Sequence, residues 1–117
     1  YIIECKRLDS TNKTGITGLN AKYIKNGIYR FVSNSYSAYY KTNGMIGFIV
    51  ESVDINKNVT YINSLLSTSF TKANTILILT NRIIVKSFDY FYYSTHRIGA
   101  EEIIIYHLMF DFAKNIQ

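Results

Sequence analysis

The sequence predicts an α/β fold in which helices join the strands of a mixed sheet and flank it. Two stretches with apolar residues at helical spacing each lie between stretches that read as strands, and further strand-like runs follow. The expected order is strand, helix, strand, helix, strands and a final helix. The 117 residues, 48% of them hydrophobic, suffice for one core, so we expect 1–117 to form a single domain.

The first strand and helix are expected in the opening third of the chain. Residues 1–6 are rich in β-branched and aromatic types, which favours a strand. After a polar loop, a helix is expected at about 19–34, capped by Asn20 or by the loop and weakened by Gly27. Its apolar residues recur three and four positions apart: Leu19, Tyr23, Ile24, Ile28, Phe31 and Val32.

A second strand and helix are expected in the middle of the chain. Residues 45–50 are nearly all apolar, which predicts a strand buried on both faces. Asp54 then stands where a helix N-cap is expected, before apolar residues at helical spacing. We expect this helix to run to about Ser67.

The last third is expected to add strands and a helix. Residues 75–80 and 83–88 read as a hairpin around Asn81 and Arg82. Gly99 ends the aromatic run that follows. Residues 103–112 are apolar almost throughout, and their length favours a buried helix over a strand.

The net charge indicates a class of binding partner, and the cysteine content indicates a cellular compartment. Thirteen Lys and Arg against eight Asp and Glu give a net charge of +5, which favours an anionic partner such as nucleic acid. A single Cys excludes an internal disulfide and fits a reducing, cytoplasmic setting, with a bacterial source expected. No apolar run approaches the roughly 20 residues of a membrane helix, so no membrane partner is expected.

Glu4 and Lys6 are the candidate catalytic residues. Side chains alternate along a strand, so both point the same way, about 7 Å apart. A carboxylate can help to hold a hard cation, and an ammonium can position the attacking water and stabilise charge that develops on a phosphate. An ordinary exposed ion pair, worth under about 1 kcal/mol, is the alternative interpretation.

The stretch Tyr1-Ile2-Ile3-Glu4-Cys5-Lys6-Arg7-Leu8 resembles the Glu-x-Lys strand of the PD-(D/E)xK, or restriction-endonuclease-like, nucleases. The helix after it and Gly44-Met45-Ile46-Gly47-Phe48 resemble the strand-helix-strand centre of that fold, so the strong resemblance covers roughly 1–50. It implies a mixed central sheet flanked by helices and a metal-dependent DNA endonuclease, used in restriction or another defence system.

The resemblance also implies a metal site and a preceding strand, with an acidic residue, that this sequence does not include. Mg²⁺ or Mn²⁺ would be held by Glu4 and by the backbone carbonyl of Cys5. In the family a further acidic residue lies on the preceding strand, and this sequence begins directly at the Glu-x-Lys strand. We therefore expect the domain to be truncated at its N-terminus and the 117-residue chain alone to be inactive. A homodimer is a further expectation, by analogy with restriction enzymes.

Four residues are candidates for binding nucleic acid. Arg97 and His96 are expected to face the Glu4 and Lys6 side and contact the scissile phosphate, with Ser94 and Arg30 as weaker candidates. The alternative interpretation of Arg97 and His96 is a solvated strand end. His107 lies among apolar residues and is interpreted as a satisfied core histidine.

Two other functions stay open. A degenerate nuclease fold could bind nucleic acid or a protein and cleave nothing, and an upstream acidic residue would distinguish the enzyme from it. An RNA-binding sheet would need aromatic residues aligned on one exposed face, and Tyr90, Tyr92 and His96 share strand parity.

Overall fold

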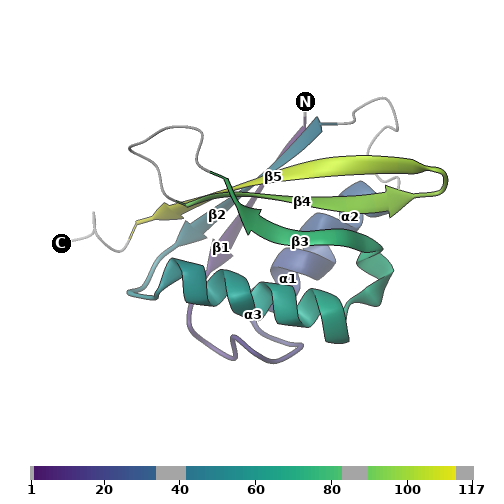
Figure 1. Ribbon diagram of the computed structural model, residues 1–117. Helices are drawn as coiled ribbons and strands as arrows, with labels where there is room; N and C mark the ends of the chain where they lie inside the picture. Colours follow the sequence, from purple (N-terminus) through teal and green to yellow (C-terminus); the bar gives the residue numbers. More distant parts are fainter. Residues whose placement is uncertain (1, 34–41, 83–89, 113–117) are drawn as a thin grey trace.

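The computed structural model describes residues 2–33, 42–82 and 90–112. These residues form a five-stranded sheet and two main helical segments (Figure 1). The strands are β1 (Ile2–Leu8), β2 (Thr42–Ile49), β3 (Thr75–Asn81), β4 (Phe91–Ile98) and β5 (Glu101–Asp111). Their order across the sheet is β1-β2-β5-β4-β3.

The sheet is mixed, as the sequence predicts. Strand β2 pairs in parallel with β1 on one side and with β5 on the other. Strand β4 runs antiparallel to both of its neighbours, β5 and β3. A mixed α/β domain is therefore confirmed, and β1, β2, β5 and β3 all point in one direction.

The first helical segment begins at Leu19 and ends at Val32, close to the predicted 19–34. It consists of α1 (Leu19–Tyr23), a π-helical stretch η1 (Ile24–Ile28) and α2 (Tyr29–Val32). Gly18 occupies the N-cap position without a side-chain hydrogen bond. Asn20 does not cap the helix; it is buried, and its side chain exchanges hydrogen bonds of 2.8 and 2.9 Å with Asn58.

The second helix, α3 (Ile55–Thr68), begins where the sequence predicts it. Asp54 is its N-cap, and the Asp54 carboxylate accepts a hydrogen bond of 3.0 Å from the Lys57 amide. A short 3₁₀ turn, η2 (Thr71–Ala73), then leads into β3.

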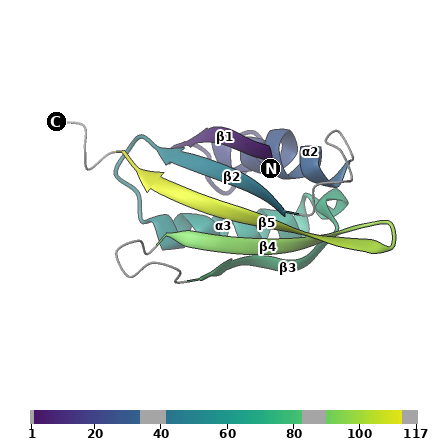
Figure 2. The same cartoon turned by 90° about the horizontal axis from the view of Figure 1, so that it is seen from above.

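Both helical segments lie on the same face of the sheet, below the strands in Figure 1. The chain topology explains this. The crossovers from β1 to β2 and from β2 to β3 proceed across the sheet in the same direction between strands of the same polarity, and right-handed crossovers then place both helices on one side. Seen from above in Figure 2, the strands lie in front of the helices, and no described helix covers the opposite face. We call that opposite side the open face.

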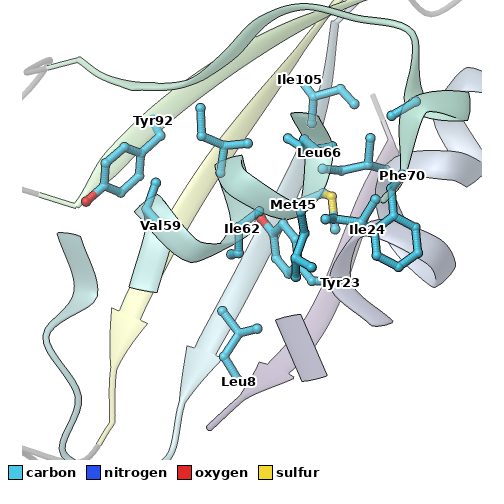
Figure 3. Packing of buried hydrophobic residues seen from close by; sticks show 14 of the residues in the cluster. Leu8, Tyr23, Ile24, Met45, Val59, Ile62, Leu66, Phe70, Tyr92 and Ile105 are labelled. Atoms are coloured by element: carbon cyan, nitrogen blue, oxygen red, sulfur yellow. The ribbon is translucent and has the colours of Figure 1, made fainter. Parts of the chain in front are cut away.

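The hydrophobic core lies between the sheet and the two helical segments (Figure 3). Leu8, Met45 and Ile105 point into it from three neighbouring strands, and Tyr23 and Ile62 point into it from the two helices. All five are at most 1% exposed. Their packing fixes the position of the first helical segment relative to β1. Glu4 and Lys6, which lie on β1, are therefore held in a fixed position relative to that helical segment.

The prediction of a C-terminal helix at 103–112 is wrong, because this segment is strand β5. Buried and more exposed residues alternate along it: Ile103, Ile105 and His107 are buried, whereas Ile104 is 36% exposed. This period of two is that of a strand with unequal faces. Length favoured a helix, but the Ile triplet is β-branched and pairing with β2 and β4 on both sides stabilises the extended form.

The prediction for the burial of β2 is partly wrong, and the prediction of a strand at 83–88 concerns residues that the structure does not describe. Strand β2 is buried fully on one face only, since Met45 and Ile49 are buried while Ile46 and Phe48 on the open face are intermediate. The strand expected at 83–88 lies outside the described residues. Within the described part of the chain, β3 pairs with β4. Among the described residues, no helix has the length and apolar character needed to cross a bilayer.

Candidate functional site

Glu4 and Lys6 lie on the same face of β1, as predicted, and this face is the one that packs against the helices. Their neighbours Ile3, Cys5 and Arg7 lie on the open face and are exposed. The prediction that the pair occupies a central strand is wrong, because β1 is the last strand on its side of the described sheet. The pair therefore lies at an edge, where a further molecule or chain segment can approach.

Glu4 lies between two cationic side chains. One carboxylate oxygen, Oε2, is 3.6 Å from Lys6 Nζ, and the other, Oε1, accepts a hydrogen bond of 3.0 Å from Arg30 Nη1. The side chains of Glu4, Lys6 and Arg30 are 13%, 22% and 48% exposed. Glu4 is thus largely enclosed, whereas Arg30 reaches from α2 toward solvent.

The π-helical stretch and Gly27 explain how the helix approaches β1 so closely. A Cβ atom placed on Gly27 would lie 2.2 Å from Met45 Cε, so the end of the buried Met45 side chain would have to shift, whereas 3.8 Å to Lys6 Cε is an ordinary contact. The π turn widens the helix and changes the facing of the residues that follow it, including Arg30. Gly27, which weakens a helix in isolation, here leaves room for the end of the Met45 side chain against the helix.

The Cys5 carbonyl points away from β2, toward the free edge of β1. The Val50 amide donates to the Leu8 carbonyl at 3.3 Å, so Leu8 directs its backbone groups toward β2. Backbone groups alternate in direction along a strand, which turns those of Cys5 the opposite way. The Cys5 thiol is exposed on the open face and plays no part in the Glu4 cluster.

The oxygens at this edge match the ligand type that Mg²⁺ prefers, but they are few. Glu4 supplies a carboxylate and Cys5 a carbonyl, and both are hard oxygen donors. No group of three or more His, Cys, Asp or Glu side chains in the described part of the chain is arranged to hold a metal ion. Both carboxylate oxygens of Glu4 already pair with Lys6 and Arg30, so a magnesium ion there would need further ligands from substrate, water or another carboxylate.

Arg97 does not face this site, contrary to the prediction. Ser94 and His96 point from β4 into the layer of the helices, so Arg97, the next residue, points to the open face. Glu4 and Lys6 are on the opposite face and three strands away. The proposed contact of Arg97 with the same phosphate is therefore dropped.

His96 and Ser94 are fully buried, so the prediction that they touch nucleic acid is also wrong. They belong to a chain of hydrogen bonds through the core. Tyr23 Oη is 2.7 Å from His107 Nδ1, and His107 Nε2 is 2.7 Å from Ser94 Oγ. Ser94 Oγ is 2.8 Å from His96 Nε2, and His96 Nδ1 is 3.0 Å from the Ala73 carbonyl oxygen.

The Ala73 carbonyl sets the direction of every bond in this chain. A carbonyl only accepts, so His96 Nδ1 carries a proton, and Nε2 of the neutral ring accepts from the Ser94 hydroxyl. Ser94 has one proton to give, so His107 Nε2 donates to Ser94, and His107 Nδ1 accepts from Tyr23. His107 is thereby confirmed as a satisfied core histidine.

Burial keeps both rings neutral. Loss of solvation lowers the pKa of His96 to about 4, against the small opposing effect of its bond to Ala73. Burial, followed by the proximity of His96, places the pKa of His107 well below its usual value. Burial also raises the pKa of Tyr23. A hydroxyl enclosed in this way meets no substrate, so the chain is structural.

The expectation of stacking residues on Tyr90, Tyr92 and His96 is not met by the geometry. Tyr92 is 3% exposed and His96 is fully buried beneath the helices. The aromatic residues of the open face are others, including Phe48, Phe110 and Tyr106, and sequence parity alone did not identify that face.

No protein-family model matches the chain, and no curated protein or solved structure matches it either. The function proposed below therefore rests on the geometry of the Glu4 site and on the resemblance of the Glu-x-Lys strand.

Proposed function

We propose that Glu4, Lys6 and Arg30 form part of the centre of a metal-dependent DNA endonuclease of the restriction-endonuclease-like type. One observation carries this proposal: a largely enclosed carboxylate and an ammonium lie together on an edge strand, with an arginine from the adjacent helix bonded to the same carboxylate. The net charge of +5 supports an anionic substrate.

Each residue has a distinct role in this proposal. Glu4 binds the metal together with the Cys5 carbonyl, and Mg²⁺ or Mn²⁺ supplies the activation of water and the neutralisation of phosphate charge. Lys6 positions the attacking water and stabilises the phosphate charge. Arg30 holds Glu4 in place before binding and contacts the DNA backbone through its exposed guanidinium.

The free edge of β1 is where a second carboxylate would complete the site. Mg²⁺ is usually held by one or two carboxylates with substrate oxygens, so Glu4 and one carbonyl hold it weakly. We propose that this second carboxylate comes from outside the described residues, as the resemblance implies, and that Glu4 and the Cys5 carbonyl alone support little cleavage.

A nicking assay on supercoiled plasmid with Mg²⁺ or Mn²⁺ tests this function in the protein made from the full reading frame. We expect cleavage by the wild type and a loss of at least about 100-fold in Lys6→Ala, with DNA binding retained. Lys22→Ala, an exposed lysine of α1, is the matched control and should cleave normally. Cleavage by Lys6→Ala at the wild-type rate would rule out the mechanism.

A second candidate function is a degenerate module that binds nucleic acid or a protein partner without cleaving. The double ion pairing of Glu4 favours it, because a carboxylate engaged by two cations resists a metal ion. In that case wild type and Lys6→Ala would be equally inactive, DNA binding would persist, and Mn²⁺ would not bind in the presence of DNA.

A further inference from the structure

The positive charge of the described residues is concentrated beside the helices. We call the segments 9–33 and 54–74, which contain both helical segments, the loop before the first and the turn after the second, the helical layer. It has two acidic side chains, Asp9 and Asp54, and six basic ones: Lys13, Lys22, Lys25, Arg30, Lys57 and Lys72. The other described residues have four basic and five acidic side chains. The helical layer thus has a net charge of +4, against −1 for the rest of the described chain.

Two of these lysines, Lys25 and Lys72, line a hollow between the first helical segment and the turn that follows α3. Its volume of about 360 Å³ is within the usual range of ligand pockets. Ser69 and Thr71 add two hydroxyl groups to the lining, and none of the described residues that line the hollow is acidic. Ammonium and hydroxyl groups both donate hydrogen bonds to anions, so this lining favours a phosphate.

The wall of the hollow that carries Lys72 is held in place by the core. The Ala73 amide donates to the Phe70 carbonyl at 3.2 Å, and the Ala73 carbonyl accepts from the buried His96 at 3.0 Å. The ring of Phe70 meets the ring of Tyr29 edge-on, with centroids 5.9 Å apart, which joins this wall to the first helical segment. The backbone around Lys72 is therefore fixed before any ligand binds, which lowers the entropic cost of binding.

We propose that this hollow binds the phosphate backbone of DNA, so that DNA approaches the Glu4 site from the helical layer. The inference rests on the proposed function for the identity of the nucleic acid. Glu4 and Lys6 face the side of the sheet on which the helical layer lies, and Arg30 of that layer bonds to Glu4 at 3.0 Å. Lys25 lies five residues before Arg30 on the same helical segment, about 8 Å along its axis, so a single duplex can contact both.

The charge at this hollow favours binding of an anion, and its apolar surface does not suit a membrane. The C-terminal end of α3 carries about half a negative charge, which opposes phosphate binding, but the two ammonium groups outweigh it. A segment that lies on an anionic membrane combines basic residues with several exposed apolar ones. Among the described residues of the helical layer, Ile16 is the single large apolar side chain that is strongly exposed, at 66%. Nucleic acid is therefore the better partner.

Fluorescence anisotropy with a labelled DNA duplex of about 20 base pairs, in EDTA and at several salt concentrations, tests the proposal. Lys25→Gln combined with Lys72→Gln should weaken binding about tenfold, and the slope of log Kd against log salt should fall by about one to two. The matched control is Lys22→Gln combined with Arg97→Gln, which removes the same charge outside the hollow. It should weaken binding by less than about threefold. Circular dichroism verifies that both double variants are folded.

Three results would overturn the proposal. Equal losses in the two double variants would mean that net charge alone explains them. Unchanged DNA affinity in Lys25→Gln with Lys72→Gln, together with a lower unfolding free energy in urea, would mean that the two lysines only neutralise the end of α3. Binding to phosphatidylserine vesicles that this variant loses, without binding of the wild type to DNA, would assign the hollow to a membrane surface.

Failure of the nuclease function is distinguishable from failure of this inference. EDTA removes the metal ion, so cleavage does not enter the binding measurement. DNA binding that depends on Lys25 and Lys72, without cleavage in Mg²⁺ or Mn²⁺, would contradict the nuclease and support the binding site. Cleavage that is unaffected by the loss of both lysines would do the reverse.

Discussion

The hydroxyl of Tyr23 on α1 donates to Nδ1 of His107 on β5 at 2.7 Å, although 84 positions separate the two residues in the sequence. This bond starts the one-way chain that continues through Ser94 and His96 to the Ala73 carbonyl. It joins the first helix to the two strands that were hardest to predict. Because this chain of hydrogen bonds is buried, its two histidines should dominate the dependence of the unfolding free energy on pH.

We expect the protein to lose stability between pH 7.5 and pH 5. His96 has a pKa of about 4 when folded and about 6.5 when unfolded, so in this range the unfolded state binds the extra proton. Stability therefore rises with pH and falls as the pH drops below about 6.5, by about 2 kcal/mol at pH 5 from His96 alone. Urea unfolding at the two pH values measures this difference.

The control for the pH prediction is His96→Gln with His107→Gln, which removes both histidines of the chain. Carboxylates titrate mainly below pH 5, so the double variant should show a nearly flat stability between pH 7.5 and pH 5. An undiminished slope in the double variant would show that other groups are responsible.

Ser94→Ala should destabilise the protein by about 2–4 kcal/mol. The change removes the one group that both accepts from His107 and donates to His96, and it leaves two buried ring nitrogens without partners. Ser67→Ala on the exposed side of α3 is the matched control and should change the unfolding free energy by less than about 0.5 kcal/mol. Similar values for both variants would contradict the bond network.

Gly27→Ala should destabilise the protein despite the better helix propensity of alanine. The new methyl group would overlap Met45 Cε, and overpacking of this kind costs about 1–3 kcal/mol against a propensity gain of about 1. In a Met45→Ala background the same change should cost less, and the difference gives the coupling energy. Additive effects in this double-mutant cycle would mean that Gly27 is not needed for close packing.

The helices and β1 were predictable from the sequence, whereas the identity of β5 was not. Helical spacing and the Asp54 cap located α3 within about one residue, because local capping and periodicity decide where such a helix starts and ends. Residues 103–112 form a strand because β2 and β4 pair with it on both sides, and that is tertiary information.

The buried side of β4 could not be predicted without knowing that 103–112 is a strand. Adjacent strand residues point in opposite directions, so His96 and Arg97 could not both face Glu4 on a regular strand. Which of them faces the helices depends on the pairing of β4 with β5 and on the layer formed by α1 and α3. The Glu4 and Lys6 pair needed only local alternation, and for that reason its shared face was predicted correctly.

Replacement of Arg30 by Ala should change metal binding and DNA binding in opposite directions. Without the guanidinium at 3.0 Å, the Glu4 carboxylate is freer to bind a cation, so Mn²⁺ affinity should rise. Arg30 is 48% exposed, which limits its ion pair to about 1 kcal/mol and the gain to about fivefold. DNA affinity should fall, because one phosphate contact is lost.

The matched control for Arg30→Ala is Arg7→Ala, which removes the same charge from the opposite face of β1. Calorimetric titration with Mn²⁺ and a DNA-binding assay, both on the protein from the full reading frame, measure the two effects. Arg7→Ala should leave Mn²⁺ affinity nearly unchanged, because Arg7 lies across the strand from the carboxylate. If both variants raise Mn²⁺ affinity equally, the effect is one of net charge, and Arg30 has no specific role at Glu4.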